Sequence, residues 1–193
     1  MKILTHCHHL NIDGPVVLSQ KNFNAPNPVL LKMIKALHSD VESYVTVNHF
    51  EENNLFMRKN INIETIRHFK EADGFIIDQV FTDNFHSLDH FFLHELSQVI
   101  GDRHFIIGPS FNKVPSFLQS RLLDEAVEFD VSAVMFDIRE TDMSDFKSLQ
   151  PLAKLKTHAK KRIEIIPVVK SPEQKDELLR NIPFDMIYIH SEQ

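Results

Sequence analysis

Short apolar runs alternate with longer amphipathic stretches along most of the chain. The runs predict seven strands, at 2–7, 43–48, 74–78, 104–108, 131–137, 163–169 and 184–190. Their apolar character is continuous rather than alternating, which is typical of strands covered on both faces in a parallel sheet. Helices are predicted between them, at 28–38, 63–72, 87–100, 116–129, 144–160 and 172–181. The pattern therefore indicates repeated strand–helix units and an α/β fold.

The spacing of these units also predicts the domain organisation. From the second strand onward, strand starts recur about every 20 to 30 residues, while 9–27 and 50–60 are interpreted as polar loops. We expect a single α/β domain over residues 1–193, with a mainly parallel sheet of about seven strand–helix units. A complete eight-unit barrel usually needs about 250 residues, and an open doubly wound sheet fits this length more easily. We nevertheless favour a TIM-like barrel, incomplete or distorted, over the open sheet, because the last third of the chain resembles closing barrel strands, as described below.

Composition narrows the classes of function. The net charge of −6 argues against broad binding to a nucleic-acid backbone, which needs a basic surface. The one cysteine, Cys7, excludes an internal disulfide and fits a reducing compartment. The sequence shows neither a signal-peptide pattern nor an apolar run long enough to cross a membrane. We therefore expect a cytoplasmic protein without a membrane partner.

Potential metal ligands gather at the predicted carboxyl ends of the strands, where parallel α/β folds bind their ligands. The first strand ends in Thr5-His6-Cys7-His8-His9, and alternate residues of a strand share a face. The predicted ligands are His6, His8, His49, Asp78 and His190, with Asp137 as a further ligand or as a catalytic base. Imidazoles with carboxylates suit zinc, manganese or iron. A metal-activated water would then attack a phosphoester of a small phosphorylated substrate.

Plainer interpretations of the same residues remain open. Twelve histidines in 193 residues bring some to strand ends by chance. Asp78 and Asp137 could equally cap the loops that follow them. His86, His90 and His94 share one face of a predicted helix, which we interpret as a solvated polar face.

Two family resemblances add to these expectations. The opening Thr5-His6-Cys7-His8-His9-Leu10-Asn11-Ile12-Asp13-Gly14-Pro15 and the later Val45-Thr46-Val47-Asn48-His49-Phe50 resemble motifs of the polymerase-and-histidinol-phosphatase (PHP) family. That resemblance covers the first quarter and implies a metal-dependent phosphoesterase in which His6, His8 and His49 are ligands. The third-strand ligand would be Asp78, where the family prefers glutamate.

The second resemblance lies in the last third of the chain. Val134-Met135-Phe136-Asp137-Ile138-Arg139-Glu140 and Ile163-Glu164-Ile165-Ile166-Pro167-Val168-Val169-Lys170 are similar to closing strands of EAL-type phosphodiesterase barrels. The name-giving Glu-Ala-Leu is missing, so this likeness implies a non-catalytic barrel that binds a nucleotide or a protein partner in a regulatory role. That is the rival to the hydrolase hypothesis.

Overall fold

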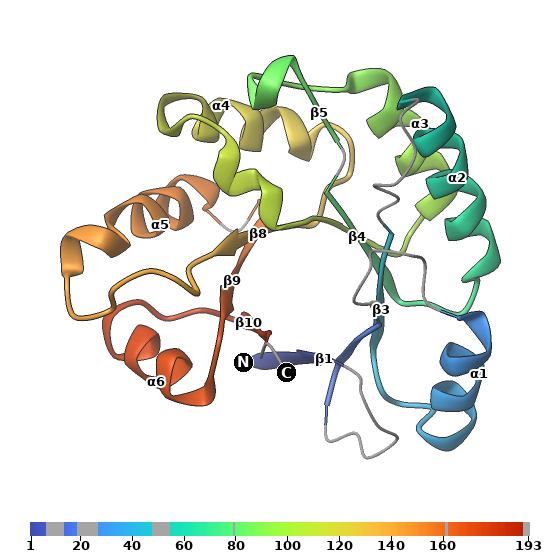
Figure 1. The fold of residues 1–193 in the computed structure, drawn as a ribbon, viewed down its shortest axis with the longest axis horizontal. Coiled ribbons are helices and arrows are strands. Elements are labelled where there is room, and N and C mark those ends of the chain that lie inside the picture. The colour runs from blue at the N-terminus through green and yellow to red at the C-terminus, as the bar shows by residue number, and fades with distance from the viewer. Residues whose placement is uncertain (7–13, 19–26, 48–54, 79, 161, 191–193) are drawn as a thin grey trace.

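The structure is a computed structural model that describes residues 1–6, 14–18, 27–47, 55–78, 80–160 and 162–190. Within these ranges, the side chains of His6, Asp83, Phe146 and residues 55–58 lie outside the description. Helices surround a ring of strands, in which the first strand, β1, lies beside the last, β10 (Figure 1).

Eight parallel strands form a closed barrel in the order β1-β10-β9-β8-β7-β4-β3-β2. Each strand pairs in parallel with both of its neighbours around the ring. The strands are β1 (Lys2–His6), β2 (Val16–Leu18), β3 (Ser43–Thr46), β4 (Gly74–Ile77), β7 (His104–Ile107), β8 (Ala133–Asp137), β9 (Glu164–Val169) and β10 (Met186–Ile189). A separate antiparallel pair, β5 (Phe81–Thr82) and β6 (Ser87–Leu88), follows β4. The predicted TIM-like barrel is thereby confirmed, and the open sheet is excluded.

Helices between successive strands cover the outside of the barrel (Figure 1). They are α1 (Pro28–Leu37), α2 (Leu55–His68), α3 (His90–Ile100), α4 (Ser116–Val127), α5 (Phe146–Ala159) and α6 (Pro172–Asn181), with short 3-10 turns η1 (Asp83–Phe85) and η2 (Pro109–Lys113). Side chains of Asn27, Asp89, Asp145 and Ser171 accept hydrogen bonds from first-turn backbone N–H groups. These N-caps satisfy donors that a helix cannot pair internally, and they fix where the helices begin.

Two apolar clusters hold the barrel together. The larger one lies between the strands and the helices. The smaller one fills the barrel interior and consists of Leu4, Val17, Tyr44, Ile76, Ile106, Ala133, Met135, Ile166, Val168, Met186 and Tyr188. Because side chains alternate along a strand, residues two positions after an interior residue are directed toward the mouth at the carboxyl ends. This alternation places Asp78 after Ile76, Asp137 after Met135 and His190 after Tyr188.

The structure corrects two details of the predicted elements. The barrel has eight strands rather than seven, because Val16–Leu18 forms β2 inside the segment expected to be a polar loop. Helix α2 begins at Leu55, within the segment 50–60 that was also expected to be a loop. Among the described residues, no helix is long and apolar enough to span a membrane.

Candidate functional site

The carboxyl mouth of the barrel brings together three of the residues expected from the sequence. Asp78 follows β4, Asp137 ends β8 and His190 follows β10. Asp137 lies near enough to influence the pKa of Asp78, and His190 near enough to influence the pKa of Asp137. The three side chains therefore share one electrostatic environment.

Asp78 is held by the turn that follows β7. The Ser110 backbone N–H donates to Asp78 Oδ1 at 2.9 Å, and Ser110 Oγ donates to the Asp78 carbonyl at 2.9 Å. Gly108 makes room for this arrangement, since a Cβ there would lie 2.7 Å from Asp78 Cγ. Burial raises the pKa of the Asp78 carboxyl, and the hydrogen bonds from Ser110 only partly oppose that effect. Asp78 is thus an acid that is harder to ionise than an exposed aspartate.

This raised pKa predicts that Asp78→Asn stabilises the protein at neutral pH. With its pKa above that of the unfolded chain, Asp78 destabilises the fold as pH rises through the interval between the two values. Asparagine mimics the protonated carboxyl, so we expect a gain on the order of 1 kcal/mol in unfolding free energy at about pH 7. Below the ordinary aspartate value of 3.8, the gain should disappear. Urea denaturation at both pH values measures it.

The exposed Asp142 supplies the control for that prediction. The side-chain and backbone hydrogen bonds from Ser144 lower its pKa, so Asp142→Asn should not stabilise the protein at neutral pH. A gain for Asp78→Asn that is equal at neutral and acidic pH would show that the ionised carboxyl is not its cause.

Asp137 is paired with an arginine two residues further along the chain. Arg139 Nε donates to Oδ1 at 3.0 Å and Nη2 donates to Oδ2 at 2.8 Å, while the Arg139 backbone N–H also donates to Oδ1. Burial would raise the pKa of Asp137, but these bonds and the charge of Arg139 outweigh it, so the pKa lies below its ordinary value. Asp137 is therefore a firmly ionised carboxylate and a weak base.

The position of this pair is fixed from the other side by Asn112 of η2. Its amide nitrogen donates to the Asp137 carbonyl at 2.6 Å, and its amide oxygen accepts from the Asp137 N–H at 2.8 Å. One side chain thus satisfies both backbone groups of Asp137 and ties η2 to the end of β8.

His190 is oriented by the tyrosine that precedes it on the same strand face. The Tyr188 hydroxyl and His190 Nδ1 are 3.0 Å apart. Burial raises the pKa of Tyr188, so the phenol stays protonated, and either its hydroxyl or a protonated Nδ1 is the donor of this hydrogen bond. This bond fixes the orientation of the imidazole ring at the mouth.

The predicted metal set is described only in part. His8 and His49 lie outside the described residues, and for His6 only the backbone is described, at the end of β1. The register pairs Thr5 with Ile189, which brings the backbone of His6 beside that of His190. Within the ranges that the structure describes, no three His, Cys, Asp or Glu side chains are grouped to hold a metal ion.

Sequence reasoning missed Ser110 and Asn112, and it gave Arg139 no role. The sequence did contain a signal for Arg139, because an arginine two residues after an aspartate at the end of a strand can form an ion pair with that aspartate. Ser110 and Asn112 belong to a 3-10 turn, and their contacts depend on a turn geometry that no periodic pattern reveals.

Comparisons with known proteins agree on the architecture. A proposed copper homeostasis protein, CutC from Streptococcus agalactiae, has a similar structure with a TM-score of 0.83 and 14% sequence identity, over 99% of both chains. An aldolase named QR15 has a TM-score of 0.61 and 14% identity, over 93% of this chain and 78% of its own. No family model and no curated protein matches the sequence. What the chain shares with both structures is the fold.

These findings overturn the two resemblances read from the sequence. Neither structural neighbour is a PHP phosphoesterase or an EAL-type protein, and nothing supports membership of the PHP family. The misleading signal was local, because histidines at the end of a first barrel strand occupy the ligand-facing mouth of any fold of this type.

Proposed function

We propose that this chain is a non-catalytic TIM-like barrel that binds a small anionic ligand of the nucleotide class at its carboxyl mouth, in a regulatory role. The observation that carries the proposal is the guanidinium of Arg139, fixed at the mouth by its ion pair with Asp137. Ligands of parallel barrels bind at this end of the strands.

The surroundings of Arg139 favour an anion. Lys113 of η2 lies near enough to lower the pKa of Asp78, and Arg139 lies near enough to influence Tyr188. Asp137 neutralises one positive charge but also holds the guanidinium in one orientation, which reduces the entropy lost when a phosphate is bound. His190 and Tyr188 add polar groups that can set the orientation of a base or sugar.

The same residues favour binding over turnover. A hydrolytic base must accept a proton near neutral pH, and the lowered pKa of Asp137 makes it poor in that role. Asp78 has the more suitable pKa, but Ser110 donates to one of its oxygens and directs the carboxyl toward η2. We therefore expect a bound nucleotide to be recovered unchanged.

Calorimetric titration with AMP and with a cyclic dinucleotide tests this function. Arg139→Gln should weaken binding about tenfold or more, since it removes a charge-assisted contact. Arg180→Gln, at an exposed position at the end of α6, is the matched control and should bind like the wild type. Unchanged affinity in Arg139→Gln, or hydrolysed nucleotide after incubation, would refute the proposal.

Copper binding is a second candidate, favoured by the likeness to the fold of CutC, which is named for copper homeostasis. The sequence Thr5-His6-Cys7-His8-His9 supplies one thiol and three imidazoles within five consecutive residues, the first two of which belong to β1. Thiolate and imidazole suit copper better than they suit magnesium or calcium. Competition with a copper(I) chelator tests it: Cys7→Ser should lose the metal, and equal retention by that variant would reject the candidate.

A further inference from the structure

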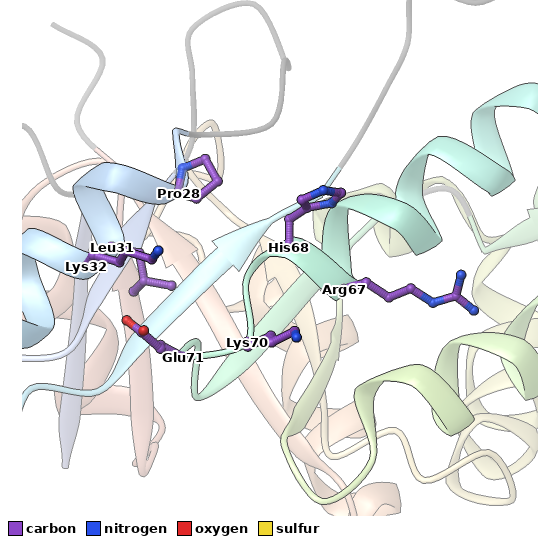
Figure 2. A pocket seen from close by; sticks show the side chains of 7 residues that line it. All are labelled: Pro28, Leu31, Lys32, Arg67, His68, Lys70 and Glu71. Atoms are coloured by element: carbon purple, nitrogen blue, oxygen red, sulfur yellow. The ribbon is translucent and has the colours of Figure 1, made fainter.

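A second concave surface lies outside the barrel, between α1 and the turn that follows α2 (Figure 2). The hollow has a volume of about 500 Å³, within the range of small-molecule sites. It is lined by Pro28, Leu31, Lys32, Arg67, His68, Lys70 and Glu71. None of these residues belongs to the mouth described above.

The hollow combines an apolar floor with charged side chains around it. Leu31 is buried and Pro28 is half-buried, whereas Lys32, Lys70 and Glu71 are exposed. Within the described part of the chain, neither Lys32 nor Lys70 has a hydrogen-bond or ion-pair partner. Lys35 of the same helix differs, since its ammonium group pairs with Asp73 at 2.6 Å. Two ammonium groups are thus left facing solvent around one cavity.

Two other lining residues, Arg67 and His68, already have a partner within α2. Arg67 pairs with Glu64, and in Figure 2 its guanidinium extends away from the other labelled side chains. The Nδ1 of His68 is 2.7 Å from the Glu64 carbonyl, which can only accept, so Nδ1 carries a proton and Nε2 is the nitrogen left to meet a ligand. Both residues also suit the negative end of the α2 dipole. The dipole of α2 does not explain the position of Lys32, which belongs to α1.

We propose that this hollow binds a small phosphorylated molecule. Its phosphate is attracted by the ammonium groups that Lys32 of α1 and Lys70 of the turn after α2 contribute from opposite sides of the hollow (Figure 2), and its apolar portion lies against Leu31 and Pro28. The lining has a surplus of positive charge on a chain whose net charge is −6, so an anion is attracted to this place rather than to the surface in general. Glu71 limits the negative charge that fits, which favours a single phosphate group over a polyanion.

The test uses phenyl phosphate and inorganic phosphate as probes, followed by two-dimensional amide NMR. Phenyl phosphate should shift the amides of residues lining the hollow, and it should bind more tightly than inorganic phosphate because its ring buries apolar area. The double variant Lys32→Gln/Lys70→Gln should bind about tenfold more weakly. The matched control is Lys147→Gln/Lys154→Gln, which makes the same charge change at exposed positions of α5 and should leave binding unchanged.

Arg139→Gln separates this site from the barrel mouth. That variant should keep full affinity for phenyl phosphate at the hollow even where it loses nucleotide binding at the mouth, so either proposal can fail alone. Equal affinity of the Lys32→Gln/Lys70→Gln variant and the wild type would overturn the inference. Equal binding of the two probes would contradict the role given to Leu31 and Pro28.

Discussion

Gly74→Ala should lower the free energy of unfolding by about 1 to 3 kcal/mol, the usual cost of overpacking a tightly filled core. A Cβ at this position would lie 2.7 Å from His104 Cβ, 2.8 Å from the His104 carbonyl oxygen and 2.8 Å from Tyr44 Cδ1. The carbonyl oxygen belongs to the neighbouring strand β7 and cannot move without disturbing the barrel ladder. Relief by the Tyr44 ring is also blocked, because that ring is fully buried in the barrel interior.

Urea denaturation of the variant and the wild type measures this cost. In a domain of this size, each kcal/mol corresponds to about 2–4 °C in Tm, so thermal melting should agree in direction. Gly14→Ala is the matched control, because among the described residues its Cβ would meet only the Ile3 carbonyl oxygen, at 3.8 Å. Gly14→Ala should change stability little. If Gly74→Ala were as stable as the control, the amino end of the barrel would be looser than its contacts indicate.

The sequence predicted the fold well where apolar runs were long enough to read. The run 163–169 reappears almost whole as β9, and the run 184–190 contains the shorter β10. The exception is β2, whose three residues are too few for a periodic signal and follow Gly14-Pro15 in a polar stretch. Val16–Leu18 is a strand because β1 and β3 flank it and pair with it on both sides. The strand forms because of its pairing with β1 and β3, and local sequence propensity does not predict it.

The start of helix α2 was also missed, because contacts with other segments rather than a local pattern determine it. Its first turns carry Arg58, Lys59 and Asn60, which gave no clear apolar stripe from which to extend the prediction at 63–72. In the structure, Lys59 pairs with Asp89 before α3, and its ammonium group lies 5.3 Å from the centre of the Phe92 ring. Contacts between helices therefore stabilise a start that an amphipathic pattern does not mark.

For the candidate site, alternation along the strands was the informative signal. Alternation predicts that Asp78, Asp137 and His190 lie at the mouth, because each comes two positions after a residue of the barrel interior. It could not say what those side chains contact there. Ser110 and Asn112 reach β4 and β8 from a turn after β7, and such contacts between distant segments depend on the closed barrel. The chemistry expected from residue types therefore changed once partners were known, most clearly for Asp137.

Removing the ion pair between Asp137 and Arg139 should also have a large effect on the free energy of unfolding. Both side chains are 25% exposed, so the pair lies between a surface and a buried salt bridge. Arg139→Gln should lower the free energy of unfolding by about 2 kcal/mol, because it leaves a half-buried carboxylate without its bidentate partner. Asp137→Asn should also destabilise the protein. The double variant should cost less than the sum of the two, by about 1 kcal/mol, because the residues contact each other directly.

The pH dependence of that cost gives an independent check. The pKa of Asp137 lies below its ordinary value of 3.8, so the pair stabilises the folded state above that value and its contribution is lost as pH falls through the lowered pKa. The effect of Arg139→Gln on stability should therefore shrink in acid. Arg121→Gln is the control, since Arg121 is 58% exposed and pairs with Glu125 at 3.2 Å, and a surface pair of this kind contributes about 0.5 kcal/mol. Strict additivity of the two mouth substitutions, with no change between neutral and acidic pH, would mean that Asp137 does not hold Arg139 in solution. The preorganised anion site at the mouth would then lose its physical basis.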